Sequence, residues 1–207
     1  MYLSTMLLCP CPPAAAITSM PTTACAENFG QLQKIIITRM SESGTLNQVS
    51  VASAPTLATW TALQAAIDGT KVVVSPFIEN PEVEPGAVRE FGGGNATLGG
   101  IPKALGTENT TFSGVMYSLT QDYIKVLKEY QCEDIGVYLV NESGQIAGNE
   151  KVAGELHPIQ IKSLFVGDKK LGGFDEPDSN SISWAFLPNW SDDFKVITPT
   201  FDPLTDL

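Results

Sequence analysis

Short apolar segments rich in β-branched and aromatic residues recur along the chain, and several alternate between apolar and polar positions. This is the pattern of β-strands that bury one face of a sheet. The candidate strands are residues 31–40, 71–78, 110–117, 135–140, 145–147, 159–166, 181–187 and 195–198. Their spacing predicts a mainly β protein of about six to eight strands, arranged as a β-sandwich or a small barrel.

Two other segments place apolar residues three or four positions apart, which predicts amphipathic helices flanking the sheet. In residues 56–68 the apolar stripe consists of Leu57, Trp60, Leu63 and Ile67. In residues 118–132 it consists of Leu119, Tyr123, Leu127 and Tyr130. Thr56 is the expected N-cap of the first helix, and Ser118 with Gln121 forms the expected capping box of the second.

Residues 79–110 are rich in glycine and proline and show no regular pattern. A segment of about 30 residues is too long for an ordinary connection, so we expect a functional excursion or a long hairpin. Its glycine run at 92–94 lacks the G-K-[S/T] ending of a P-loop and the spacing of a dinucleotide-binding turn. We therefore interpret the run as a loop tip, where glycine permits unusual backbone dihedrals.

The chain has 207 residues, 43% of them hydrophobic, so one domain with its own core is expected. Residues 1–26 differ from the rest because they are apolar, contain four prolines and lack Lys and Arg. We expect an extended N-terminal arm over 1–26 and a single β-rich domain over 27–207. A secretory or lipoprotein leader is the alternative for this arm, although the basic residues that begin such leaders are missing. No stretch is long enough for a membrane span.

The sequence contains 23 acidic and 12 basic residues, which gives a net charge of −11. Proteins that hold nucleic acid tightly carry clustered basic residues, and the nearest approach to a cluster is the pair Lys169-Lys170. The charge therefore argues against tight binding to DNA or to an anionic membrane. It is compatible with a surface that DNA passes without adhering, since like charges repel.

Candidate catalytic and metal-binding residues are few. His157 is the sole histidine, and the cysteines Cys9, Cys11, Cys25 and Cys132 lack the spacing of a zinc or redox motif. The acidic pairs Asp175-Glu176 and Asp192-Asp193 do not fit a calcium-loop pattern, so we interpret them as solvated loop residues. We expect no catalytic site, no cofactor and no metal.

Residues 110–148 read as a strand (TTFSGVMY), a helix (SLTQDYIKVLKEYQC), a second strand (IGVYLV), a turn (NESG) and a return strand (QIAG). This order resembles the tail tube proteins of tailed phages and their prophage relatives. Residues 25–30 (CAENFG) and 200–204 (TFDPL) are also similar to segments of such virion proteins, so the resemblance covers residues 25–204. A ring or connector protein of the tail is as compatible as the tube itself.

The resemblance implies a virion structural protein, not an enzyme, whose copies form hexameric or larger rings around a conduit for the genome. It implies a location in the phage tail and, during assembly, in the host cytoplasm. The partners would be further copies of the chain and other tail proteins, with double-stranded DNA passing through without tight binding. The alternative function is a secreted or lipid-anchored β-sandwich binding module.

Residues 79–110 are the first candidate for contacts between copies, and the N-terminal arm is the second. Glycines allow a close approach to a neighbour. Trp190 lies in a predicted loop, where it could anchor an interface or pack on its own domain. The candidate assembly residues are Phe91, Gly92, Gly93, Gly94, Asn95, Leu98 and Trp190.

Overall fold

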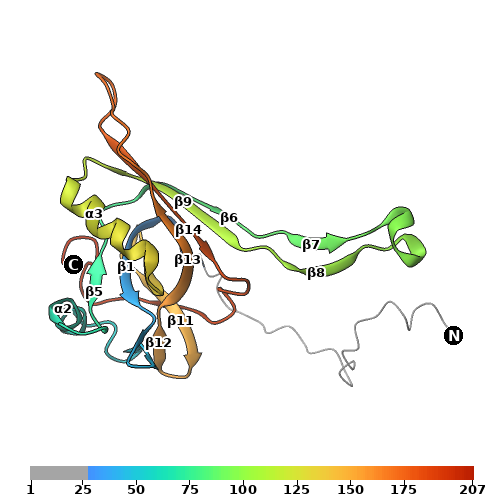
Figure 1. Cartoon of the computed structure of the whole chain (residues 1–207). Coiled ribbons are helices and arrows are strands. Elements are labelled where there is room, and N and C mark those ends of the chain that lie inside the picture. Colours follow the sequence, from blue (N-terminus) through green and yellow to red (C-terminus); the bar gives the residue numbers. More distant parts are fainter. Residues whose placement is uncertain (1–27) are drawn as a thin grey trace.

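The computed structural model describes residues 28–207, so the arm expected over residues 1–26 lies outside the described residues. The body is a curled antiparallel sheet with helices packed against it, and a long hairpin projects from one side (Figure 1). The sheet forms a half-barrel. The prediction of a mainly β fold, a sandwich or barrel flanked by helices, is therefore confirmed.

The described residues contain two α-helices, three 3-10 turns and fifteen strands of very different lengths. The helices and turns are α2 (Leu57–Ala65), α3 (Gln121–Glu129), η1 (Gly94–Ala96), η2 (Leu98–Gly100) and η3 (Tyr130–Cys132). The strands are β1 (Leu32–Arg39), β2 (Ser41–Glu42), β3 (Thr45–Leu46), β4 (Val49–Ser50), β5 (Val72–Val74), β6 (Glu79–Glu84), β7 (Val88–Phe91), β8 (Lys103–Thr107), β9 (Thr110–Tyr117), β10 (Ile135–Asn141), β11 (Ile146–Val152), β12 (Glu155–His157), β13 (Ile159–Val166), β14 (Ser179–Phe186) and β15 (Phe194–Ile197).

Six strands form the curled sheet in the order β1–β10–β13–β14–β9–β6, with every neighbouring pair antiparallel. Curling brings the two ends of this series close together. The Ile78 amide, just before β6, donates to the Gln33 carbonyl of β1 at 2.8 Å. Strand β5 pairs with β1. Strand β11 pairs with β10, β15 and β12, and β12 pairs in turn with β4. The sheet thus forms a half-barrel that does not close.

Two hydrophobic cores lie on opposite faces of β1 and β10. Ile35 of β1 and Val137 of β10 belong to the core inside the half-barrel. Their neighbours Ile36 and Tyr138 belong to the second core, which α2 covers with Trp60. Because side chains alternate between the faces of a strand, β1 and β10 are buried on both sides, which explains their nearly continuous apolar sequences.

Helix α2 is shorter than predicted. It ends at Ala65, because the next residue, Ala66, has a non-helical ψ of 147°. Ile67 therefore lies beyond the helix and is fully exposed. The prediction that Ile67 completes the buried stripe is therefore wrong. Trp60 carries the packing instead: its Nε1–H donates to the Ala54 carbonyl at 2.8 Å, and its ring meets that of Tyr138 edge-on.

Helix α3 starts later than predicted and turns a different face to the core. It begins at Gln121 with Thr120 as N-cap, and Ser118 has φ +54°, so the expected capping box does not form. Tyr123 is 54% exposed, whereas Ile124 and Leu127 are buried. Two overlapping stripes of the sequence satisfy a helical period, and the position of the sheet selects the one that contains Ile124.

Candidate assembly surfaces

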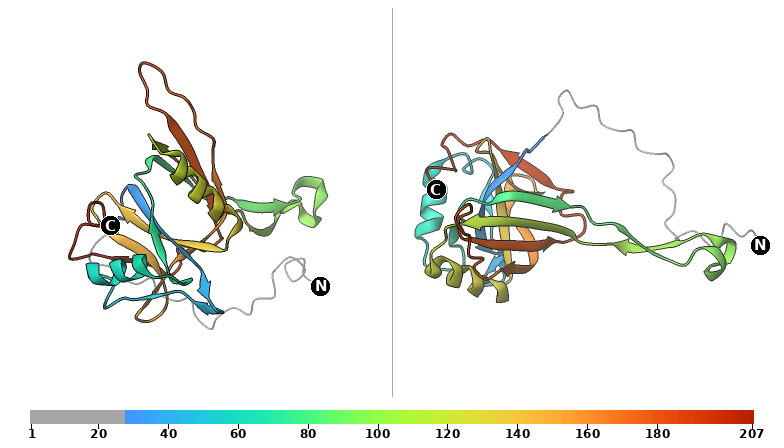
Figure 2. Two further views of the ribbon diagram at one scale, coloured as in Figure 1. Left: turned by 60° about the vertical axis from the view of Figure 1, so that its left-hand side comes forward. Right: turned by 90° about the horizontal axis from the view of Figure 1, so that it is seen from above.

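The segment predicted as an excursion is a two-stranded arm. Strand β6 pairs with β9 at the edge of the half-barrel, and the chain then leaves the body as β7, whose one partner among residues 28–207 is β8. Figure 2 shows the arm extending away from the body in both views. A register shift lies between Arg89 and Glu90, opposite Gly106, whose φ is +140°. The arm is thus a continuation of two sheet strands, not an irregular loop.

The tip of the arm is a glycine turn held by one threonine. Gly92, Gly93 and Gly94 all have positive φ, a region in which glycine has no steric cost. The hydroxyl of Thr97 accepts from the Gly93 amide at 3.0 Å and donates to the Ile101 carbonyl at 2.8 Å. The glycines therefore allow the chain to reverse, and Thr97 gives the reversal a defined shape.

The arm buries almost nothing against the described residues of its own chain. From Glu82 to Asn109 every residue is exposed except Gly86, Gly93 and Thr97, which are half-buried. Large apolar side chains are among the exposed residues: Val83, Val88, Phe91, Leu98, Ile101 and Leu105. No charged residue occurs from Phe91 to Pro102. The tip is therefore an uncharged surface with apolar side chains facing solvent.

A two-stranded hairpin with no third strand and no covered face is only marginally stable in water. Grouped exposed apolar side chains are typical of surfaces that contact a protein, a membrane or a ligand. The geometry of the arm can therefore serve as a contact between polypeptides. Six of the seven predicted assembly residues lie together at its tip: Phe91, Gly92, Gly93, Gly94, Asn95 and Leu98.

Trp190, the seventh, lies at the root of the arm. Its ring stacks on Phe186 with centroids 4.4 Å apart and meets Phe194 edge-on at 5.8 Å. It belongs to a ladder of aromatic rings that runs from the inner core to the surface. In order from the core outward, these are Phe112, Trp184, Phe186, Trp190, Phe194 and Phe29. Trp190 is half-buried, so it packs on its own domain and still presents part of its ring.

A groove of about 1100 Å³ opens beside this ladder. It lies where the half-barrel fails to close, between the segment leading into β1, strand β6 and the segment Trp190–Val196. Its apolar lining includes Phe29, Leu32, Val83, Phe112, Trp190 and Phe194. Polar groups of Gln31, Gln145, Asp192 and Lys195 are also part of the lining. Sequence reasoning did not find this groove, because its walls come from five separate parts of the chain.

The outward face of β6, β9 and β14 carries small, hydroxyl and acidic side chains in register. Across the three strands the rows are Glu79–Val115–Ser181, Glu82–Ser113–Ser183 and Glu84–Thr111–Ala185. Lys162 of β13 continues the third row, but its Nζ lies 2.5 Å from a carboxylate oxygen of Asp134. This contact lowers the pKa of Asp134 through the hydrogen bond from Lys162. The face therefore offers little free positive charge.

A second protrusion is the connection between β13 and β14, residues 167–178, which rises from the body in Figure 1. Leu171 and Phe174 on it are largely exposed. The sequence prediction omitted these residues, although apolar side chains beside the glycines of Leu171-Gly172-Gly173-Phe174 were an available signal. They are further candidates for contact with another chain.

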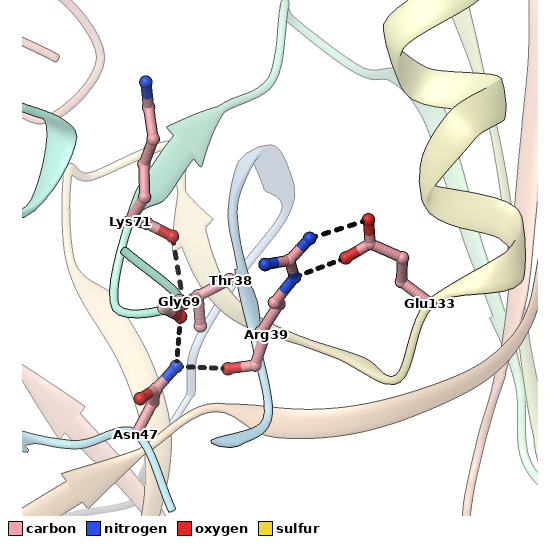
Figure 3. Close-up of polar contacts among 6 residues, drawn as sticks. All are labelled: Thr38, Arg39, Asn47, Gly69, Lys71 and Glu133. Atoms are coloured by element: carbon pink, nitrogen blue, oxygen red, sulfur yellow. Dashed lines mark hydrogen bonds and ion pairs between the residues drawn. The ribbon is translucent and has the colours of Figure 1, made fainter. Parts of the chain in front are cut away.

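A group of polar residues beside β1 connects two loops to the sheet. The buried Asn47 amide donates to the carbonyls of Arg39 at 2.8 Å and Gly69 at 2.7 Å (Figure 3). The guanidinium of Arg39 makes two hydrogen bonds to Glu133, which lower the pKa of that carboxyl. Because these groups are satisfied by one another and by backbone, their arrangement fits a structural role.

His157 is buried, with Nδ1 3.3 Å from the Asn47 carbonyl and Nε2 3.4 Å from a Glu155 oxygen. Within residues 28–207, no group of three His, Cys, Asp or Glu side chains is arranged to hold a metal ion. Over the same range, none of the helices has the length and apolar character to cross a membrane.

No protein-family model and no curated protein matches the sequence. Among solved structures, the chain is similar to one in the tail of an empty gene transfer agent particle with C6 symmetry, at 14% identity and TM-score 0.32, covering 55% of this chain and 83% of that one. It is also similar to a chain of the native gene transfer agent virion, at 13% identity and TM-score 0.32, covering 58% of this chain and 82% of that one. A third similar chain comes from the baseplate of the anti-feeding prophage, at 9% identity and TM-score 0.34, covering 88% of this chain and 100% of that one.

Proposed function

We propose that this protein is a structural subunit of the tail of a phage-like virion, and that its copies assemble into hexameric or larger rings around a conduit for the genome. The observation that carries the proposal is the arm. It projects two strands and an uncharged apolar tip into solvent, with no partner in the described part of its own chain.

Burial of the arm against a second copy would supply the covering that the hairpin lacks. Each apolar side chain of Val or Leu size that becomes buried contributes roughly 1.5–3 kcal/mol. The arm and the surface that accepts it are different parts of the molecule, so the contact is head-to-tail. Head-to-tail contacts generate rings when the rotation closes and filaments when it does not.

The outward face of β6, β9 and β14 is our candidate for the lining of the conduit. Across these three strands the rows contain glutamates and hydroxyl side chains and no Lys or Arg, and the chain as a whole has a net charge of −11. Such a surface repels the phosphate backbone and lets DNA pass without adhering. Strand β6 pairs with β9 at the end of the described sheet and lies beside the arm, so its outer edge can continue into a neighbouring sheet when arms dock.

On this proposal the chain acts by assembly and not by catalysis. Its partners are copies of itself and other tail proteins, and its location is the virion tail after assembly in the host cytoplasm.

The test is assembly with and without the tip. Replacing residues 92–102 by Asn-Gly joins the paired residues Phe91 and Lys103 through a two-residue hairpin turn. We expect this variant to keep its melting temperature and far-ultraviolet circular dichroism, but to remain monomeric at concentrations where the full chain forms rings or tubes. Mass photometry and negative-stain microscopy report the difference.

A matched pair of point variants controls for general effects of charge. Leu98→Asp places a carboxylate at the tip, and Ile67→Asp places one at a fully exposed apolar position after α2. Assembly should be lost in the first and kept in the second. Normal assembly of the tip-deleted protein would refute the proposal.

The aromatic groove favours one alternative, a β-sandwich binding module that is secreted or lipid-anchored. A half-exposed tryptophan between apolar walls is a common setting for a ligand. A chain that stays monomeric at every concentration with its arm intact would support this alternative.

A further inference from the structure

We propose that the tip of the arm, Phe91–Pro102, seats in the groove beside Trp190 of a second copy of the same chain. This inference rests on the proposed assembly function and specifies which surface receives the arm.

The groove has the composition of an interface centre. Phe29, Trp190 and Phe194 are each half-buried, so their rings are held by the core and still face solvent. Aromatic anchors that are packed from behind and open in front dominate binding energy at protein interfaces. A partner that covers them gains apolar burial without having to order flexible side chains.

The charges of the groove and of the tip match. Lys195, the cation that lines the groove, already lies 3.0 Å from a carboxylate oxygen of Glu150. The positive charge of Lys195 is therefore already balanced by Glu150, and an anionic ligand would gain little from it. The tip brings no charged residue, so seating it adds no charge that would need a partner in the groove. Asp192, the carboxylate in the lining, is exposed, so the tip must leave it in contact with water.

The shapes match as well. The tip presents Leu98 and Ile101 on a narrow glycine turn, and the groove of about 1100 Å³ has room for several side chains of that size. Gly92 and Gly94 of the turn are exposed, and the exposed side chain of Gln31 at the groove can donate to or accept from their backbone groups. Apolar contact and polar satisfaction can then occur together.

The tip cannot reach the groove of its own chain. Pro81 and Val83, at the root of the arm, form part of the groove wall. The strands from Glu84 to Phe91 carry the tip roughly 20–25 Å away at about 3.3 Å per residue, and both views in Figure 2 show the arm directed outward. The contact must therefore join two copies, with the tip of one at the root of the next.

Complementary variants test this directly. Ser191 is exposed and lines the groove, so Ser191→Arg should block it without disturbing the core. The tip replacement (residues 92–102 by Asn-Gly) keeps the groove and loses the tip. We expect each variant alone to be monomeric at concentrations where the full chain assembles. Its dissociation constant should be at least about tenfold higher, the size of effect expected at an interface anchor.

Mixing the two variants gives the decisive result. One copy supplies a tip and the other a groove, so the mixture should form dimers of one copy of each and stop there, as measured by mass photometry. Thr61→Arg on α2, outside the groove, is the control and should assemble normally.

A photo-crosslinker at Leu98 identifies the acceptor. In a mixture of isotopically light and heavy chains, crosslinks between copies to the segment 190–196 support the proposal. Normal assembly of Ser191→Arg, with the tip still required, would overturn the groove as acceptor while leaving the assembly function intact. Crosslinks that place residues 1–27 of the same copy in the groove would also overturn it.

Discussion

At the scale of single residues, the buried Asn141 organises the approach to the groove. Its Oδ1 accepts from the amides of Ser143 at 3.0 Å and Gln145 at 2.7 Å, which fixes the turn between β10 and β11. Its Nδ2 donates to the carbonyl of Phe29 and so ties the incoming chain to that turn. One side chain thereby positions two of the segments that line the groove.

Asn141→Ala should destabilise the protein by about 1–3 kcal/mol, since the turn amides and the Phe29 carbonyl lose their partners. Urea denaturation measures the change. Asn141→Asp is the matched variant: it keeps the acceptor oxygen for the two turn amides but buries a negative charge against the Phe29 carbonyl and the Gln145 side-chain oxygen, so its loss at neutral pH should exceed that of the alanine variant. An unchanged urea midpoint for the alanine variant would contradict this account.

At the scale of elements, α3 shows how tertiary contacts choose between two helix faces. Leu127 belongs both to the predicted stripe and to the observed one, and it is buried. The remaining positions differ: the helix turns Ile124 toward the half-barrel and leaves Tyr123 in solvent. A phenol ring tolerates this exposure because its hydroxyl is hydrated.

Two alanine substitutions distinguish these faces. Ile124→Ala should cost about 2–4 kcal/mol because a buried aliphatic side chain is removed. Tyr123→Ala should change stability by less than about 0.5 kcal/mol, as for other surface positions. Thermal or chemical denaturation of the two variants gives the comparison, and the opposite ranking would show that the helix packs with the face predicted from sequence.

At the scale of the whole molecule, net charge opposes assembly. Each copy carries −11, so copies repel one another as they approach. The proposed tip and groove are nearly uncharged, so the contact itself depends little on salt. Screening by ions should therefore act mainly on the repulsion.

We expect association to strengthen as the salt concentration rises from about 0.01 M, where the Debye length is about 30 Å, to about 0.15 M, where it is about 8 Å. Light scattering across a NaCl series measures this, with sucrose of equal osmolality as the control. Association that weakens with salt would indicate that ion pairs between copies, and not apolar contacts, hold the assembly.

The sequence alone determined the class of fold and the positions of its strongest elements. Strands β1, β9, β10, β13 and β14 agree with predicted segments to within about two residues, the usual uncertainty of strand boundaries. They were predictable because β-branched runs and turn residues act locally. The glycine turn at 92–94 was recognisable for the same reason, since the backbone there requires residues without a Cβ.

Contacts between distant segments fix which way these elements face and what they enclose. The choice of Ile124 over Tyr123 depends on where the sheet lies, and the groove depends on five segments meeting where the half-barrel stays open. The arm was expected as an excursion or a hairpin, but pairing of β7 with β8 and the exposure of its side chains follow from its leaving the sheet edge. Local sequence specifies which conformation a segment prefers, whereas contacts between distant segments specify which of its surfaces remain uncovered.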